Sequence, residues 1–552
     1  MKKILKDASE IIDLLLKERG IDSEKKKEIF FSPTKEDLYD PFLMPGVEGA
    51  VKRILLAKKK KQKVVVFGDY DVDGVCSTYI LWDYLYRELG IDVTPFIPSR
   101  FDDGYGMNED TMRKFQKEGV DLVVTVDCGI KDQELIAKFP EMEFIVTDHH
   151  TIDQESEKRW EADSSSIVVH PKLKNSKYPF SEICATAVVY KLVQALAQTK
   201  EDESWDRYLE FVALATVCDV MPLVDENRIF VKLGMEAMAK TENVGLQELI
   251  RSSSIKFNEI QSYMLGFVFG PKINAAGRLG NALDAVRLFA TKSPVRAQKI
   301  AQELGDLNKQ RQELTITTLT KALEQISGVQ EQEKLMFVYD HDWHEGVIGL
   351  VAGKLMEQYN RPIICATIIK GKVTGSARSI SAYNITEAIT THSSLLERFG
   401  GHAQAAGFSL DKENLDKFKK ALQKIANEII TDNDIKKKIH IDFILPIEIL
   451  SMELLEMLER FEPFGIGNPR PIFQIDDLKV QGIFKIGREG KHIKLILISK
   501  TGERIEALGF NMAERFENVN IGDRMGIVGN LDINRWNGQE RIQMKLKDYK
   551  KR

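Results

Sequence analysis

The sequence predicts a multidomain α/β protein that combines a parallel-sheet domain, a long connecting helix, a smaller α/β domain and a C-terminal β-barrel. The chain has 552 residues, which is too long for one hydrophobic core. From residue 64 to about residue 150, nearly continuous apolar strands alternate with helical segments, as in a parallel sheet covered on both faces. After about residue 440, short strands separated by Gly and Asn turns replace this pattern and predict a small closed barrel.

The first strand of the first α/β domain is expected to start at residue 63. Gly90 is a suitable C-cap for its first helix, and Asn108 is a suitable N-cap for its second. The expected strands are 63–71, 93–100, 121–129 and 143–150, and the expected helices are 75–90, 108–119 and 132–140. A mostly helical region is expected to follow, from about 180 to 260.

The remaining boundaries follow changes in pattern. Apolar residues recur with roughly helical spacing from Ile300 to Ile326, which predicts a helix long enough to connect two domains. The expected barrel strands are 473–487, 492–499, 503–510, 523–534 and 540–549. The expected divisions are an N-terminal helical segment (1–50), the parallel-sheet domain (51–293), the connecting helix (294–328), the second α/β domain (329–432) and the barrel domain (433–552).

Composition narrows the class of protein. Hydrophobic residues make up 43% and charged residues 29% of the chain, which fits a soluble globular protein, and no apolar run approaches a membrane span. Five cysteines without paired spacing indicate a reducing compartment, so we expect a cytoplasmic protein. The net charge of -5 gives no support for nucleic-acid binding, but it leaves room for a local basic channel.

Acidic and histidine residues gather where apolar segments end. In open α/β sheets, binding sites form at the carboxyl ends of strands, so these residues are expected to converge. They are Asp69, Asp71 and Asp73 after the first strand, Asp127 after the third, Asp148, His149 and His150 after the fourth, and Asp219 after a later apolar run. An oxygen-rich site with one imidazole suits Mn²⁺ or Mg²⁺ better than zinc, and several carboxylates can hold two ions with one carboxylate bridging. The alternative for the aspartates of the first strand is a helix-capping turn, because Asp is common before helices.

The four motifs DYDVDG, VDCG, TDHH and VCDVMPL, in this order, resemble the metal motifs of the DHH phosphoesterase superfamily. Over essentially the whole chain the sequence is similar to the branch of exonucleases specific for single-stranded DNA. The resemblance implies that Asp71 and Asp127 hold one metal ion, and that His150 contacts the scissile phosphate. It implies that the second ion is held by Asp73, Asp127, His149 and Asp219, with Asp127 bridging.

One ligand position departs from the superfamily. Related pyrophosphatases have a histidine ligand four residues before the position of Asp71, where this chain has Phe67. The first ion is then bound more weakly, or Asp69 partly substitutes for the missing ligand. Asp148 is expected to orient a neighbouring histidine.

Other residues suit phosphate and DNA. Arg278 and Asn274 lie among small residues, where a guanidinium can make bidentate phosphate contacts, although Arg278 could also be an ordinary surface residue. Arg100 and Tyr105 lie in a glycine-containing loop after the second strand, which lies by the substrate in the exonucleases that the chain resembles, and the alternative is a plain connection. Arg311, near Asn308, is as well explained by a solvated helix face.

The second α/β domain and the barrel add further candidates. Ser376 and Arg378 are two residues apart and should share one strand face. Gly400, Gly401 and His402 are expected to precede a helix, whose N-terminus would bind an anion. The resemblance implies that Ser376, Arg378 and Arg278 hold the 5′ phosphate of the strand and that His402 contacts the scissile region. His341 and His344 could contact phosphate, support the structure or, less in keeping with their surroundings, bind a metal.

The C-terminal strands resemble an OB-fold. Trp536, beside a basic stretch, could stack on a DNA base, or it could pack in the barrel or at an interface.

These observations and the resemblance together imply a monomeric 5′→3′ exonuclease that needs two Mn²⁺ or Mg²⁺ ions and degrades single-stranded DNA to 5′-mononucleotides. Recombination, mismatch repair and base-excision repair are the implied pathways, with single-strand binding protein and a helicase as partners and no membrane association. Two alternatives remain open. Relatives with the same core cleave oligoribonucleotides, cyclic dinucleotides or pyrophosphate, and others are DNA-binding scaffolds that have lost the metal ligands.

Overall fold

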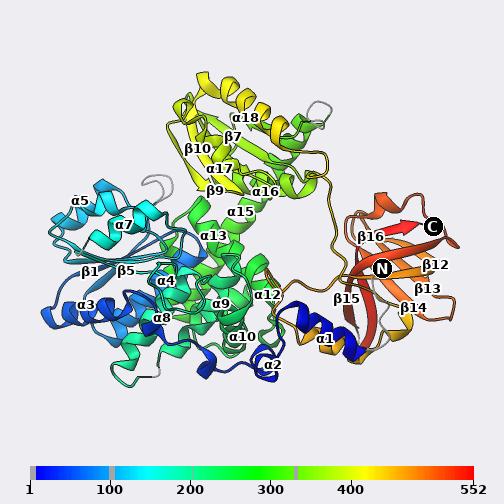
Figure 1. Cartoon of the computed structure of the whole chain (residues 1–552), viewed down its shortest axis with the longest axis horizontal. Coiled ribbons are helices and arrows are strands. Elements are labelled where there is room, and N and C mark those ends of the chain that lie inside the picture. The colour runs from blue at the N-terminus through cyan, green and yellow to red at the C-terminus, as the bar shows by residue number, and fades with distance from the viewer. Residues whose placement is uncertain are drawn as a thin grey trace. The chain divides into compact units, whose positions relative to one another are not determined.

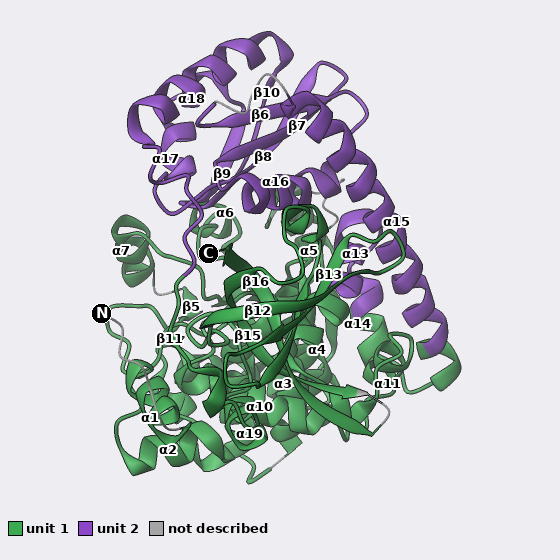
Figure 2. Ribbon diagram, turned by 90° about the vertical axis from the view of Figure 1, so that its right-hand side faces the viewer, with its two compact units in different colours: residues 1–270, 286–297, 440–552 green, residues 271–285, 298–439 purple. Residues whose placement is uncertain are grey.

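A computed structural model describes residues 8–98, 106–163, 165–202, 204–327, 333–536 and 538–551 (Figure 1). The chain forms two compact units (Figure 2). The first contains residues 1–270, 286–297 and 440–552, and the second contains residues 271–285 and 298–439. The predicted fold class is confirmed: a parallel-sheet domain, a second α/β domain on a long helix, and a C-terminal closed barrel.

The first sheet is entirely parallel, with the strand order β2-β1-β3-β4-β5. Its strands are β1 (Val64–Gly68), β2 (Val93–Phe96), β3 (Leu122–Val126), β4 (Glu143–Thr147) and β5 (Ser166–Val169). The helices around it are α3 (Val47–Lys60), α4 (Val72–Asp83), α5 (Glu109–Lys117), α6 (Gln133–Ile136) and α7 (Gln154–Ala162). Figure 1 shows α5 and α7 on one face of the sheet, and α3 and the later helix α8 (Ala185–Gln198) on the other. Phe67, Phe115 and Trp160 belong to the core between the sheet and the α5–α7 face.

Two helices of this domain differ from the prediction. The first begins at Val72, three residues earlier than expected, because the Asp71 side chain caps it, and a π-helical turn (Tyr84–Glu88) follows its end. The third, α6, has only four residues, since the chain turns after Ile136 and brings Phe139 into the same core.

A helical region follows, as expected. It begins with α8 and continues with α9 (Leu209–Cys218), α10 (Asp225–Met238), α11 (Val244–Arg251) and α12 (Ser262–Met264). Helix α9 is apolar apart from Glu210 and Thr216, and all but its last two residues are buried, which is typical of a central core helix. No described helix is both long enough and apolar enough to cross a bilayer.

The second unit has a mixed sheet with the strand order β6-β7-β8-β10-β9. Its strands are β6 (Met336–Asp340), β7 (Ile363–Ile369), β8 (Lys372–Arg378), β9 (Arg398–His402) and β10 (Ala405–Asp411). Its helices are α13 (Gly270–Leu279), α14 (Leu283–Ala290), the long α15 (Pro294–Ile326), α16 (Glu345–Tyr359), α17 (Ile385–Thr390) and α18 (Leu415–Ile429), of which α13 to α15 also contribute residues to the first unit. Helix α16 packs on the face that carries Ile363 and Cys365, and α18 packs on the opposite face.

The C-terminal strands close into a barrel, because β12 pairs with both β13 and β15. Its elements are β11 (Phe443–Ile444), α19 (Met452–Glu459), β12 (Phe473–Ile486), β13 (His492–Ile498), β14 (Arg504–Gly509), β15 (Arg524–Trp536) and β16 (Gln539–Lys551). The first two helices of the chain, α1 (Ala8–Glu18) and α2 (Glu24–Phe31), contribute to the same hydrophobic core. The N-terminal segment therefore packs with the C-terminal domain, more than 400 residues away along the chain.

Candidate metal centre and phosphate-binding surface

The turn from β1 to α4 brings the first aspartates together. Asp71 is the N-cap of α4, and its side chain accepts hydrogen bonds from the backbone N–H groups of Asp73 (2.9 Å) and Gly74 (3.1 Å). A side chain at Gly74 would overlap the backbone of Asp69, so only glycine allows this close turn. The expected strand 63–71 is therefore too long at its end, since β1 stops at Gly68 and Asp71 and Asp73 lie at the start of α4. Both the capping role and the clustering that the sequence suggested occur in the same turn.

Asp73 occupies the first turn of α4 and is 1% exposed. Its two carboxylate oxygens accept hydrogen bonds from the N–H groups of Ala185 and Thr186, each 2.7 Å long. These N–H groups open helix α8, where the helix dipole favours a negative charge. The sequence did not reveal this contribution, because backbone N–H groups make the contact with the carboxylate and such groups are present at almost every residue.

Asp127 follows β3 directly and takes a left-handed backbone conformation, with φ of 63°. Few residues other than glycine adopt this conformation, and Asp is one that tolerates it. Asp127 is 3% exposed, and its N–H donates to the carbonyl of Thr147 at the end of β4. The ends of β3 and β4 are thereby held together.

Asp148, after β4, is a buried acceptor for several N–H groups. Its Oδ1 accepts from the backbone N–H groups of His149 (2.7 Å) and His150 (3.1 Å), and lies 2.7 Å from the Nδ1 of the His150 ring. Its Oδ2 accepts from the N–H of Ile130 at 3.1 Å. Asp148 thus orients His150, as its position suggested.

Asp219 approaches from a different direction, as the C-cap of α9 rather than from a strand end. The His149 Nε2 lies 3.3 Å from the Asp127 carboxylate and 3.7 Å from the carboxylates of Asp73 and Asp219. Three sets of residues have ligand atoms within 4.8 Å of one another: Asp69, Asp71 and Asp127; Asp73, His149 and Asp219; and Asp127, His149 and His150. Asp127 belongs to two of them.

Burial and mutual repulsion disfavour the charged form of several of these acids. Burial, followed by the charge of Asp73, raises the pKa values of Asp71, Asp127 and Asp219. Burial also lowers the pKa of His149, which favours the neutral imidazole that ligates metals. A divalent cation would offset this repulsion and keep the carboxylates ionised.

The donor set fits Mn²⁺ or Mg²⁺. Asp219 Oδ2 and His149 Nδ1 are buried, and neither makes a hydrogen bond within the described part of the chain. Several carboxylate oxygens with one neutral imidazole match the preference of these ions. Phe67 is fully buried in the hydrophobic core, with its ring centre 5.4 Å from that of Phe96, whereas Asp69 belongs to the ligand cluster.

His170 is a buried histidine that sequence reasoning overlooked. Its Nε2 lies 2.9 Å from the carbonyl of His150, and its Nδ1 accepts the N–H of Lys172 at 3.1 Å. Burial lowers the pKa of His170 to about 4, so the ring is neutral and supports the backbone at His150. Its position at the end of β5 was the available signal.

In the second unit, three candidate phosphate ligands lie along the start of α16. Arg278 Nη1 donates to the carbonyl of Gly346 (3.1 Å), and Arg378 Nη1 donates to Ser376 Oγ (3.2 Å). A Cβ on Gly349 would lie 2.9 Å from Ser376 Oγ and 3.3 Å from Arg378 Nη2, so the helix approaches both residues closely. Helix N-termini with nearby guanidinium groups are suited to anions.

The expectation that Gly400, Gly401 and His402 precede a helix is wrong. They lie in β9, an edge strand whose residues are exposed. Ala405 pairs with both His402 and Arg378, so the two side chains point to the same face of the sheet, two strands and roughly 10 Å apart. His402 is therefore exposed on the surface of the sheet, at the edge strand β9.

The remaining candidates are scattered. Asn274 is half-buried on α13, and Arg311 on α15 donates to Asn308 Oδ1 at 3.1 Å. His344 caps α16 by accepting the N–H of Gly346, which is a structural role, and His341 is exposed. Arg100 and Tyr105 lie outside the described residues, as does the side chain of Trp536.

Comparison with known proteins agrees with this arrangement. The DHH family N-terminal domain matches residues 63–216, the DHHA1 domain matches residues 332–428, and the RecJ OB domain matches residues 441–548. The chain is 34% identical to the single-stranded-DNA-specific exonuclease RecJ of Bacillus subtilis, over 98% of this chain and 67% of that protein.

Two solved structures also match. RecJ from Thermus thermophilus in complex with Mn²⁺ superimposes with a TM-score of 0.82 at 29% identity, over 98% of this chain and 76% of the other. Its complex with Mg²⁺ gives a TM-score of 0.77 at 28% identity, over 98% and 74%. With the three family domains in order along the chain, and a relative 34% identical over 98% of this chain, the chain belongs to the RecJ family.

Proposed function

We propose that this chain is a metal-dependent exonuclease that hydrolyses single-stranded DNA from its 5′ end to 5′-mononucleotides. The observation that carries the proposal is the buried cluster of carboxylates around His149, in which Asp127 belongs to two ligand sets. Structural ion pairs do not require so many acids in one place. A phosphodiester hydrolase that uses two cations does.

In this proposal, Asp71 and Asp127, supported by Asp69, hold one cation. The other is held by Asp73, Asp127, His149 and Asp219. When bound, Mn²⁺ or Mg²⁺ lowers the pKa of a water molecule and neutralises the oxygens of the phosphoryl group.

His150 is the residue that meets the scissile phosphate. Burial opposes protonation of its ring, but the hydrogen bond and the charge of Asp148 outweigh burial and raise the pKa of His150. A partly exposed, protonated imidazole can donate a hydrogen bond to a phosphate oxygen. His170 and Asp148 together orient it.

Recognition of the strand end is assigned to the start of α16. Arg278, Ser376 and Arg378 supply two guanidinium groups and a hydroxyl group, a set that suits a terminal phosphate with its extra negative charge. His402 lies on the same sheet face as Arg378 and would contact the strand nearby. Arg100, Tyr105, Asn274, Arg311 and Trp536 are further proposed contacts with DNA.

The C-terminal barrel is the proposed platform for the downstream strand, since OB-folds bind single strands in a groove. We further propose a cytoplasmic monomer that acts in recombination, mismatch repair and base-excision repair with single-strand binding protein and a helicase. Pull-down of the purified chain with each candidate partner tests this part separately.

A nuclease assay tests the activity. The substrates are single-stranded and duplex DNA labelled at the 5′ end, with and without Mn²⁺, and the variant is Asp127→Asn, which removes a shared ligand but preserves the side-chain shape. We expect mononucleotide release from the single strand only, which disappears in Asp127→Asn while single-strand binding persists. Faster turnover of a dinucleotide would favour the short-substrate alternative, and binding without any cleavage would favour a scaffold.

A further inference from the structure

The backbone immediately after Asp219 is strained. Val220 has a φ of 60°, a conformation that β-branched residues adopt only when neighbouring structure imposes it, at a cost of about 1–3 kcal/mol. The Val220 side chain is 61% exposed, so its own packing does not impose this conformation. The conformation belongs to the turn that ends α9, in which the N–H of Met221 donates to the carbonyl of Thr216 at 3.1 Å, and residues 221–224 continue from this turn.

Residues 222–224 lie against loop 462–468, which precedes β12. The N–H of Leu223 donates to the carbonyl of Ile466, at 2.6 Å. A Cβ on Gly465 would lie 2.7 Å from Leu223 Cδ1, and a Cβ on Gly467 would lie 2.9 Å from Val224 Cγ1. The two glycines thus let the loop backbone touch the segment that carries the metal ligand.

Hydrogen bonds from buried side chains fix the conformation of loop 462–468. The Asn468 side chain is buried, donates to the carbonyls of Phe461 (2.8 Å) and Pro463 (2.9 Å), and accepts from Arg19 Nε (2.7 Å). Arg228, on α10, donates to the carbonyls of Phe461 and Glu462, both at 2.9 Å. Buried hydrogen bonds of this kind give the loop one geometry.

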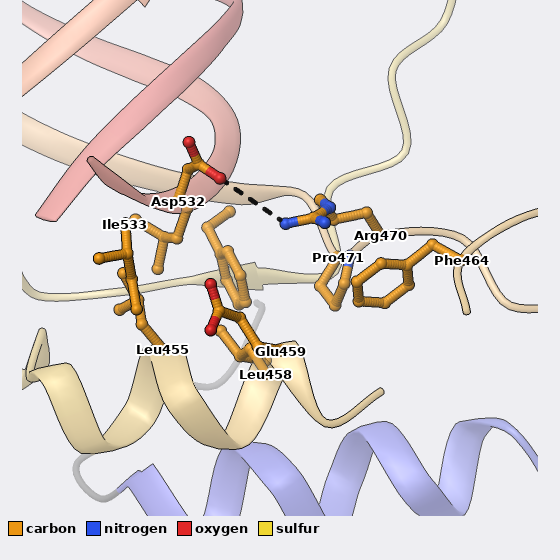
Figure 3. Close-up of a pocket in the computed structure, with 10 residues that line it drawn as sticks. Leu455, Leu458, Glu459, Phe464, Arg470, Pro471, Asp532 and Ile533 are labelled. Carbon is orange, nitrogen blue, oxygen red and sulfur yellow. Dashed lines mark ion pairs between the residues drawn. The ribbon is translucent and has the colours of Figure 1, made fainter. Parts of the chain in front are cut away.

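Arg470, which follows the loop, contacts both the loop and the barrel. Figure 3 shows Arg470 beside Phe464 and facing Asp532 of β15. The Arg470 guanidinium lies 4.6 Å from the centre of the Phe464 ring, 2.7 Å from Glu462 and 3.9 Å from Asp532. A continuous set of contacts therefore links β15 to Leu223, four residues after Asp219.

We propose that loop 462–468 positions Asp219. The contacts of this loop with Arg228 of α10 and with Asp532 of β15 then influence how tightly the metal centre binds its ions. The inference rests on the proposed metal centre. Residues that orient metal ligands change metal affinity by roughly 10–100-fold when altered. A loop that served only to join domains would leave that affinity unchanged.

The first test perturbs one contact and then relieves it. Mn²⁺ binding to the full chain is measured by titration calorimetry for Gly465→Ala, Leu223→Ala and the double variant. We expect Gly465→Ala to weaken Mn²⁺ binding by roughly tenfold, and the double variant to recover most of it, because the Leu223 side chain no longer obstructs the new methyl group. Equal Mn²⁺ affinity in Gly465→Ala and the unmodified chain would overturn the proposal.

A second pair separates the contact from backbone strain. Gly467 and Gly522 both have positive φ, 76° and 98°, but no atom lies within 4 Å of a Cβ at Gly522. Gly467→Ala should weaken Mn²⁺ binding by at least tenfold more than Gly522→Ala, and excess Mn²⁺ should restore nuclease activity, which it would not do for an unfolded variant. Equal effects of the two substitutions would contradict the proposal. No Mn²⁺ binding by the unmodified chain would instead refute the metal centre itself.

Discussion

Asp148 and Asp127 are both almost fully buried, yet their surroundings move their pKa values in opposite directions. Burial alone would raise both, but hydrogen bonds and the nearby imidazoles lower the pKa of Asp148 well below its ordinary value. Asp127 has burial and the charges of Asp73 and Asp71 acting together, and its pKa rises. Asp148 is therefore a stable anion that orients a histidine, whereas Asp127 needs a cation to remain ionised.

Substitution of Arg378 tests whether this residue recognises the 5′ end of the DNA strand. Arg378→Ala removes a guanidinium from the start of α16, so we expect the preference for a 5′-phosphorylated over a 5′-hydroxyl strand to fall by roughly tenfold, the value of one lost charge-assisted hydrogen bond. The measurement is kcat/KM on both substrates. Arg296→Ala, at an exposed arginine, should leave the ratio unchanged. Equal loss on both ends in Arg378→Ala would exclude this pocket.

Glu210 makes the stability of the fold depend on pH. It lies in the first turn of α9, at the opposite end of the helix from Asp219. Burial raises the pKa of the Glu210 carboxyl to about 7, so the folded chain keeps this carboxyl protonated between about pH 4.5 and pH 7, where the unfolded chain ionises it. The contribution of this carboxyl to the free energy of unfolding is fully present below about pH 4.5. It falls by about 3 kcal/mol in total as the pH rises through 7. The gain in melting temperature of Glu210→Gln over the unmodified chain should therefore increase from pH 5 to pH 8. Glu236→Gln, at an exposed glutamate, should give the same difference at both pH values.

At the scale of elements, the turn from β1 into α4 depends on one glycine. A methyl group at Gly74 would overlap the backbone of Asp69, so Gly74→Ala must push α4 away from β1 and separate Asp69 from Asp71. We expect Mn²⁺ affinity to fall by roughly tenfold or more, as measured by calorimetry.

Gly305→Ala in α15 is the matched control for a helical glycine. No atom lies within 4 Å of a Cβ there, so this change should stabilise the chain by about 0.5–1 kcal/mol and leave Mn²⁺ binding intact. If Gly74→Ala behaved in the same way, the close approach of α4 to Asp69 would not matter for the metal centre.

At the scale of the whole molecule, the two ends of the chain share one hydrophobic core. Leu15 on α1 is fully buried in the cluster that contains the barrel residues. Leu15→Ala should cost about 2–5 kcal/mol and should increase hydrogen exchange in the barrel strands, although these lie far away in sequence. Leu56→Ala, at a residue that is 39% exposed, should leave barrel exchange unchanged. Barrel protection that survived Leu15→Ala would show that the barrel folds independently of α1.

Strand ends were the most predictable feature of the candidate site. Asp127 and His149 follow apolar strands whose order in a parallel sheet obeys general rules, so their meeting at one edge could be expected from the sequence. The position of Asp71 as a helix cap was available as an alternative, and the structure shows that capping and clustering are compatible. Gly400 to His402 were misplaced because a glycine-rich segment is equally suited to an edge strand and to a helix start.

The sequence by itself determined the types of the elements and the chemistry of the acids, because hydrophobic periodicity and ligand preference are local properties. Three contacts were decided only by the tertiary structure. The first N–H groups of α8 bind the Asp73 carboxylate, α1 packs in the hydrophobic core of the barrel, and loop 462–468 contacts the segment after Asp219. Each of these contacts joins segments more than 100 residues apart, through backbone groups or ordinary apolar side chains. Such groups occur at nearly every position, so nothing in their local sequence distinguishes the few that make these contacts.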